Sequence, residues 1–143
     1  MKQERVRDWM TSPVITINED ATLPEACELI RQHKIRRLPV VNKEGKLVGI
    51  VTRGDLRGAQ PSEATTLSIW ELNYLLSKLK IAKIMSPDAI TIPMDATLSE
   101  AAQVMIDSKI SGLPVVDEKG DLVGMITESD IFRMVVKHWR EAE

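Results

Sequence analysis

The chain has 143 residues, 43% hydrophobic and 28% charged, a composition typical of globular proteins and not of disordered or fibrous ones. Its formal net charge is -2, so it lacks the overall basic field with which proteins hold nucleic acid or an anionic membrane. The single cysteine, Cys27, excludes an intrachain disulfide and a cysteine-based metal cluster.

The sequence contains no signal for membrane insertion or secretion. No apolar run approaches the roughly 18 residues of a membrane helix, and the first residues lack the apolar stretch of a secretory signal. The two histidines, His33 and His138, are isolated, and no nucleophile, base and orienting acid occur together. We therefore predict a cytoplasmic protein that is not an enzyme, has no catalytic residues and holds no metal.

The chain is an internal duplication. Placing Met10 on Met85, a shift of 75 positions, aligns residues 6–56 with residues 81–131 without a gap, and 22 of these 51 pairs are identical. Such a repeat predicts two copies of one structural unit.

Each copy predicts the same elements in the same order. The β-branched runs at 14–17 and 89–92 favour strands. Capping boxes that begin at Thr22 and Thr97 predict helices. The LPVV and LVG runs that follow are joined by a turn containing Gly45 or Gly120, which predicts a hairpin, and a further helix comes next. The fold class is therefore α+β, with two β-α-β-β-α repeats.

The domain boundaries follow from the duplication. Repeat 1 spans residues 6–60 and repeat 2 spans 81–137, while residues 61–80 form a linker loop and helix and 138–143 end the terminal helix. The linker helix is predicted to begin after Ser68, which with Glu71 forms another capping box. One repeat of about 50 residues would be marginally stable, so we expect the two to pack around a pseudo-twofold axis with two equivalent clefts.

The duplicated motifs resemble those of tandem CBS domains, which are regulatory modules that bind adenosine-containing ligands. The resemblance rests on three motifs that occur in both halves in the same order, where x is any residue and h a hydrophobic one. They are MTSP or MSPD, the I-x-x-LPVV segment and G-h-h-T-x-x-D. The linker is similar to that of the acetoin-utilization protein B group. The resemblance implies AMP, ADP or ATP as a regulatory ligand, no required cofactor, a homodimer and an unknown regulated protein.

The resemblance also implies two ligand sites, each combining residues of both repeats. One would combine the first strand and pre-LPVV segment of repeat 1 with the T-x-x-D motif of repeat 2: Val14, Thr16, Ile35, Arg36, Arg37, Thr127, Ser129 and Asp130. The other would combine the corresponding elements in the opposite sense: Ala89, Thr91, Ile110, Ser111, Thr52, Arg53, Gly54 and Asp55. In both, apolar side chains would hold adenine and the aspartate would hold ribose.

The T-x-x-D motif has two interpretations, as a ligand-binding site and as a helix cap. Its carboxylate can accept hydrogen bonds from both ribose hydroxyls, while free N–H groups at a helix start face a phosphate. It is also an ordinary capping box with Asp in place of Glu. Arg36 and Arg37 correspond to Ser111 and Gly112, so the site with Arg36 is expected to take the more phosphorylated ligand.

The sequence pattern also admits other ligands and another class of function. S-adenosylmethionine, NAD or a cyclic dinucleotide would suit the same pattern. A ligand-free dimerisation or interaction scaffold is a second class of function.

Overall fold

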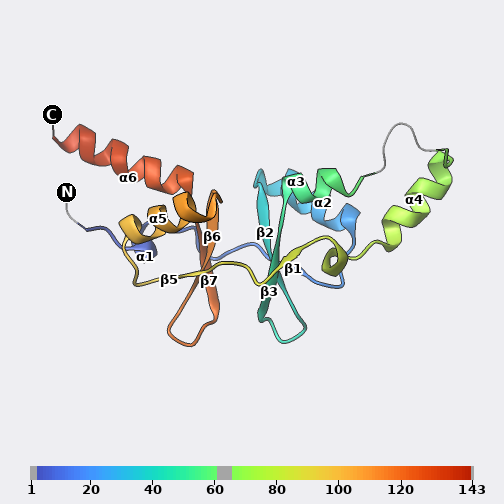
Figure 1. Ribbon diagram of the computed structural model, residues 1–143, viewed down its shortest axis with the longest axis horizontal. Coiled ribbons are helices and arrows are strands. Elements are labelled where there is room, and N and C mark those ends of the chain that lie inside the picture. Colours follow the sequence, from blue (N-terminus) through green and yellow to red (C-terminus); the bar gives the residue numbers. More distant parts are fainter. Residues whose placement is uncertain (1–2, 61–65, 143) are drawn as a thin grey trace. The chain divides into compact units, whose positions relative to one another are not determined.

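The computed structural model describes residues 3–60 and 66–142 (Figure 1). The chain forms two compact units, each containing a sheet and helices, as the α+β prediction requires. We call Ile15–Ala89 the middle unit, and Met1–Val14 together with Ile90–Glu143 the terminal unit. The loop predicted at residues 61–65 lies outside the described residues.

The middle unit is a four-stranded sheet with helices on one face. Its strands lie in the order β1-β2-β3-β4, with β1 parallel to β2 and the other pairs antiparallel. Helices α2 and α3 lie side by side on the sheet (Figure 1). The elements are β1 (Ile17–Asn18), α2 (Leu23–His33), β2 (Arg37–Val41), β3 (Leu47–Thr52), α3 (Arg53–Gly58), α4 (Ile69–Lys78), the 3-10 helix η1 (Ile81–Lys83) and β4 (Ser86–Pro87).

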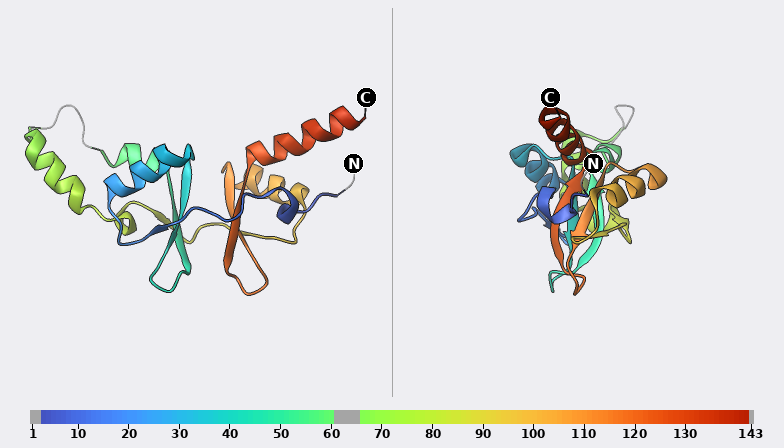
Figure 2. Two further views of the ribbon diagram at one scale, coloured as in Figure 1. Left: turned by 180° about the vertical axis from the view of Figure 1, so that it is seen from behind. Right: turned by 90° about the vertical axis from the view of Figure 1, so that its left-hand side faces the viewer.

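The terminal unit repeats this plan with three strands in the order β5-β6-β7. Helices α5 and α6 contact β6 and β7 respectively, and the hairpin turn lies at the end of the sheet away from them (Figure 2). The elements are α1 (Val6–Trp9), β5 (Ile92–Pro93), α5 (Leu98–Ser108), β6 (Gly112–Val116), β7 (Leu122–Thr127) and α6 (Glu128–Glu141).

The segment before each repeat's first strand packs on the unit that contains the other repeat's sheet. Val6 is fully buried in the terminal unit, and its N–H donates to the carbonyl of Ala96 at 2.9 Å. Ile81 is likewise fully buried in the middle unit. The compact units therefore differ from the sequence repeats, because residues 6–14 belong to the terminal unit and 81–89 to the middle unit.

The first strand of each repeat is shorter than predicted. Of the runs at 14–17 and 89–92, only Ile17 and Ile92 lie in strands. These strands pair in parallel with two residues each of β2 and β6, at the sheet edge, so the ladder extends no further toward the N-terminus.

The predicted helix starts and hairpin turns are confirmed. Thr97 accepts the Glu100 N–H at 3.1 Å, and Thr22 and Glu25 form the corresponding capping box in the middle unit. At the turn of the first hairpin, the Asn42 side chain accepts two backbone N–H groups. Gly45 there has φ 77°, a left-handed conformation that glycine adopts without strain.

Helix α4 begins where predicted and packs only along one face. Ser68 caps it by accepting the Glu71 N–H at 3.2 Å. Leu76 and Leu79 pack against the core of the middle unit, whereas Trp70 on the other face is 80% exposed. Among the described residues, no helix is both long enough and apolar enough to cross a membrane.

The start of the chain is joined to α6 through Glu4. Its carboxylate accepts the Trp9 Nε1–H at 3.1 Å and lies 3.0 Å from His138 Nε2. The hydrogen bond from Trp9 is the main cause that lowers the pKa of Glu4, with His138 acting in the same direction. These contacts stabilise α1 against the terminal helix.

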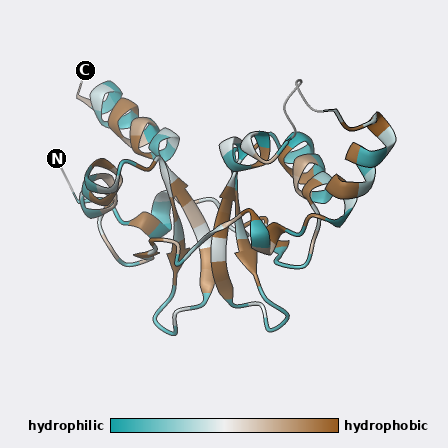
Figure 3. Cartoon of the chain, turned by 45° about the vertical axis from the view of Figure 1, so that its right-hand side comes forward, coloured by the Kyte–Doolittle hydropathy of each residue, from teal (hydrophilic) through white to brown (hydrophobic). Residues whose placement is uncertain are grey.

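Each core is built from aliphatic side chains on the strands and the inner helix faces. The strands are mainly hydrophobic and the hairpin turns hydrophilic (Figure 3). Leu38, Val40 and Val51 are fully buried in the middle unit, and Leu113, Val115 and Ile126 are their fully buried equivalents in the terminal unit. The residues that pack are thus the ones that the duplication keeps most alike.

We predict that Gly49→Ala destabilises the protein and that Gly58→Ala does not. A Cβ on Gly49 would lie 2.7 Å from both Met85 Sδ and the Ser86 carbonyl, whereas one on Gly58 meets nothing within 4 Å. Urea denaturation should show a loss of about 1–3 kcal/mol in the free energy of unfolding for Gly49→Ala. For Gly58→Ala it should show no loss, or a gain of up to about 1 kcal/mol. Equal effects would contradict the close approach of β3 and β4.

Candidate functional site

The T-x-x-D segment of the middle unit lies where β3 ends and α3 begins. The Thr52 N–H donates to Asp55 Oδ2 at 2.8 Å, and the Asp55 N–H donates to Thr52 Oγ1 at 3.1 Å. Asp55 is half-buried, and its Oδ1 has no hydrogen-bond partner among the residues that the structure describes. The capping interaction therefore leaves one carboxylate oxygen that can accept a ligand hydroxyl.

The equivalent segment of the terminal unit uses its carboxylate more fully. Asp130 Oδ2 accepts the Thr127 N–H at 2.9 Å and lies 3.3 Å from Thr127 Oγ1. Asp130 Oδ1 accepts from Arg133 Nη1 at 2.7 Å, and Asp130 is only 5% exposed. A ligand would have to displace the Arg133 guanidinium to reach this carboxylate.

Within each unit, strand pairing brings the pre-LPVV segment beside the T-x-x-D segment. Arg37 pairs with Thr52 across β2 and β3, and the Arg53 N–H donates to the Arg36 carbonyl at 2.7 Å. In the terminal unit the Glu128 N–H donates to the Ser111 carbonyl at 3.0 Å. Residues that the sequence prediction assigned to different sites are therefore neighbours within one unit.

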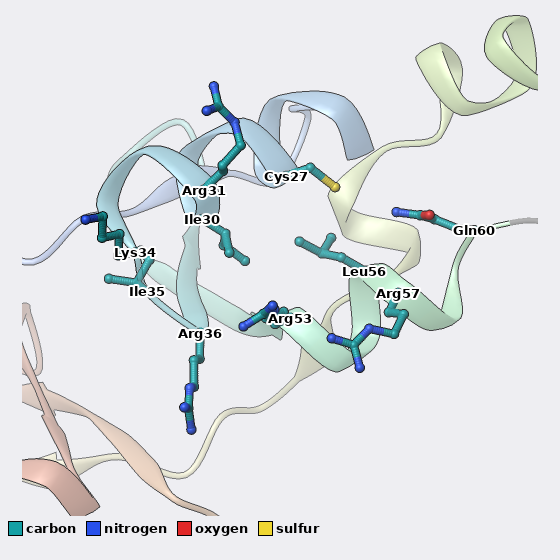
Figure 4. Close-up of a pocket in the computed structure, with 10 residues that line it drawn as sticks. All are labelled: Cys27, Ile30, Arg31, Lys34, Ile35, Arg36, Arg53, Leu56, Arg57 and Gln60. Carbon is teal, nitrogen blue, oxygen red and sulfur yellow. The ribbon is translucent and has the colours of Figure 1, made fainter.

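A hollow of about 640 Å³ opens between α2 and α3 in the middle unit (Figure 4). We call it the basic hollow. Figure 4 shows Ile30 and Leu56 pointing into it from the two helices, with Arg53 and Arg57 both extending from α3. It is lined by Cys27, Ile30, Arg31, Lys34, Ile35, Arg36, Arg53, Leu56, Arg57 and Gln60.

The remaining predicted residues are divided between the two units. The middle unit contains Thr16, half-buried beside β1, together with the exposed Gly54 of α3 and with Ala89. The terminal unit contains five more: Val14, Thr91, Ile110, Ser111 and Ser129. The assignment of these residues to sites that combine both repeats stays a prediction.

The sequence reasoning missed three residues of the basic hollow, namely Arg31, Arg57 and Gln60. A signal for one of them was present, because Arg53 and Arg57 are four positions apart and so share one face of a helix. The hairpin was predicted, but its register changes by one residue between Val40 and Val41, so the turn alone did not indicate that Arg37 lies opposite Thr52.

Two other kinds of site find no support. No group of three or more metal-ligating side chains is found in the described part of the chain. Burial raises the pKa of the Cys27 thiol, which disfavours the reactive thiolate.

Comparison with known proteins identifies the class to which this fold belongs. The sequence model of the CBS domain matches residues 6–62 and 81–137. The chain therefore belongs to the CBS domain family and carries two CBS domains.

Solved structures of CBS pairs match nearly the whole chain. The CBS domain pair of protein MJ0100, solved with 5′-methylthioadenosine and S-adenosyl-L-methionine, is 31% identical, with a TM-score of 0.79 over 96% of this chain and 99% of its own. CBSX2 of Arabidopsis thaliana, solved with AMP, is 28% identical, with a TM-score of 0.76 over 94% and 97%. A putative acetoin utilization protein of Vibrio cholerae is 32% identical, with a TM-score of 0.79 over 97% and 95%.

These matches bear out the resemblance seen in the sequence. They cover 95–99% of the matched chains, and one is the acetoin-utilization type that the linker resembles. The chain is accordingly a CBS-pair module, like the solved structures that it matches.

We predict that Asp130→Ala costs more stability than Asp55→Ala. Asp130 is buried and bonded through both oxygens, whereas Asp55 is half-buried and bonded through one. Removing a buried acceptor leaves its donors unpaired, so Asp130→Ala should lower the free energy of unfolding by about 1–3 kcal/mol and Asp55→Ala by about 0.5–1.5 kcal/mol. Urea denaturation of the two variants measures the difference, and the reverse order would contradict the contacts described.

Proposed function

We propose that this CBS pair is a regulatory module that binds an adenosine-containing ligand, with Asp55 as the principal ribose acceptor. The observation that carries the proposal is the uncommitted Oδ1 of Asp55 beside a capping bond that fixes the carboxylate. Two hydroxyls on adjacent ribose carbons can both donate to one carboxylate, and hydrogen bonds to a charged acceptor are the stronger kind.

The chemistry beside Asp55 also suits an adenine nucleotide. Arg53 lies within the T-x-x-D segment, is exposed and forms no ion pair among the described residues, so its guanidinium is available for phosphate. Two similar CBS pairs were solved with adenosine compounds, one with AMP and one with 5′-methylthioadenosine and S-adenosyl-L-methionine. We therefore infer AMP, ADP or ATP as the ligand, with S-adenosylmethionine as the first alternative.

The second wall of the site is proposed on the family pattern. Ala89, Thr91, Ile110 and Ser111 would complete the site of Asp55. Val14, Thr16, Ile35 and Arg36 would do so for Asp130, whose carboxylate must first release Arg133. We expect the Asp55 site to bind more tightly for this reason.

We further infer that ligand binding acts on assembly or on a partner protein in the cytoplasm. Apolar side chains stand out from two helices: Ile69, Trp70, Tyr74 and Leu75 on α4, and Phe132 and Trp139 on α6, each more than half exposed. Large exposed apolar groups of this kind commonly mark association surfaces, which supports a homodimer. A ligand would shift such an association by binding one arrangement more tightly than another.

The variant Asp55→Asn tests ribose binding by Asp55 while it keeps the capping interaction. The amide oxygen of Asn can still accept the Thr52 N–H, but the second atom becomes a donor and cannot accept a ribose hydroxyl. We expect the melting temperature to stay within about 2 °C and AMP affinity to fall about tenfold or more, as loss of a charge-assisted hydrogen bond implies. Isothermal titration of AMP into both proteins measures this.

Asp107→Asn, on the exposed surface of α5, is the control and should bind AMP like the wild type. A panel of AMP, ADP, ATP, S-adenosylmethionine, NAD and a cyclic dinucleotide identifies the preferred ligand. Unchanged AMP affinity in Asp55→Asn would contradict the role of Asp55. No binding of any compound, in a protein that is still folded and dimeric, would favour the scaffold function.

A further inference from the structure

We propose that the basic hollow of the middle unit is a binding site for an oligophosphate chain. Five of its lining side chains are cationic (Arg31, Lys34, Arg36, Arg53 and Arg57), and none is acidic. The chain as a whole has 21 acidic and 19 basic residues, so this gathering of one sign departs from its overall charge.

The cations of the hollow are poorly neutralised by the protein itself. Arg31 pairs with Glu28 at 2.5 Å, and both side chains are largely exposed. Lys34, Arg36, Arg53 and Arg57 form no ion pair within residues 3–60 and 66–142. Arg53 and Arg57 lie one helical turn apart on α3, where like charges repel. An anion bound between α2 and α3 would remove this repulsion.

The other repeat shows that packing does not require these cations. At the positions equivalent to Arg31, Arg36, Arg53 and Arg57 the terminal unit has Ile106, Ser111, Glu128 and Phe132. Ile106 and Phe132 are 69% and 64% exposed, so the same helix faces carry apolar groups there without being buried. Only Lys34 retains its charge in the equivalent residue, Lys109.

The size and walls of the hollow suit a chain of phosphates. Its volume of about 640 Å³ lies within the range of about 300–1,000 Å³ usual for small-molecule sites. Ile30 and Leu56 give it an apolar floor, on which charged groups are less screened by water than on an open surface. Guanidinium groups bind phosphate oxygens in pairs, which a linear oligophosphate offers repeatedly.

The inference deepens the proposed function, because the hollow adjoins Asp55 through the hydrogen bond between the Arg53 N–H and the Arg36 carbonyl. The hollow itself is formed by residues of the middle unit alone. The phosphate chain is either that of a nucleoside triphosphate or a free inorganic oligophosphate. Titration with inorganic tripolyphosphate, ATP and adenosine distinguishes the two sources.

The test is isothermal titration of tripolyphosphate into the wild type and into variants that lack one positive charge. It is done at about 150 mM salt, which screens non-specific attraction between the anion and exposed charges. We expect the wild type to bind, and Arg53→Gln and Arg57→Gln each to weaken binding about tenfold. The matched pair is Lys34→Gln and Lys109→Gln. Both residues end a helix in the same left-handed conformation, with φ 54° and 56°, so the substitutions cost the fold alike.

Lys34→Gln should weaken tripolyphosphate binding and Lys109→Gln should not. The proposal is overturned if the wild type does not bind tripolyphosphate, or if the two lysine variants lose affinity equally. If Arg57→Gln weakens ATP but leaves adenosine unchanged, the hollow receives the phosphate tail of a nucleotide. Tripolyphosphate binding with no binding of adenosine or ATP would support the hollow as a site for free oligophosphate and sink the adenosine function instead.

The opposite outcome is that Asp55→Asn weakens adenosine binding while Arg53→Gln and Arg57→Gln leave the affinity for ATP unchanged. It would leave the proposed function intact and overturn the oligophosphate site. Melting temperatures of all variants confirm folding, and the two arginines are exposed, so their substitution should not lower them.

Discussion

The structure of the candidate site depends on the pair of hydrogen bonds between Thr52 and Asp55. Where β3 turns into α3, two backbone N–H groups lose their strand or helix partners, and these two side chains satisfy both. The same bonds hold the carboxylate in a fixed orientation with its second oxygen uncommitted. Structural and ligand-binding readings of the motif are therefore compatible, because capping uses one oxygen and a ribose would use the other.

The two repeats share one fold but differ at their surfaces. Core positions are conserved between the repeats, as Leu38 and Leu113 or Val40 and Val115 illustrate. The surface positions differ in chemistry: Arg36 against Ser111, and Arg57 against Phe132. The two aspartates are identical in sequence and yet differ in their surroundings, since Arg133 occupies the carboxylate of Asp130 and no corresponding ion pair of Asp55 is found in the described residues.

Much of the fold was predictable because it depends on local rules and on the repeat. The capping boxes, the hairpin turns at Gly45 and Gly120 and the order of elements follow from short-range patterns that the structure confirms. The length of β1 was not predictable, since it depends on how far β2 extends beside it. The packing of Val6 on the sheet of repeat 2 was missed for a similar reason, because a contact between residues 90 positions apart leaves no local signal.

The site was predictable only in part. Thr52, Asp55, Thr127 and Asp130 stood out through their repetition, but the sequence could not distinguish a carboxylate with one free oxygen from one fully bonded to Arg133. On α6, Met134 is buried and Ile131 and Val135 pack against the core of the terminal unit, whereas Val136 and Trp139 are exposed. That Arg53 and Arg57 of α3 line a hollow could not be predicted from the sequence, because the hollow depends on α2 lying opposite them.

Backbone amide NMR during titration with AMP tests whether Asp55 forms the adenosine site, because it reports on each T-x-x-D segment separately. We expect the amides of Thr52 to Asp55 to shift in a saturable manner, and at lower AMP concentration than those of Thr127 to Asp130. A folded protein in which AMP, ATP and S-adenosylmethionine leave the amides of both segments unmoved would contradict this role of Asp55.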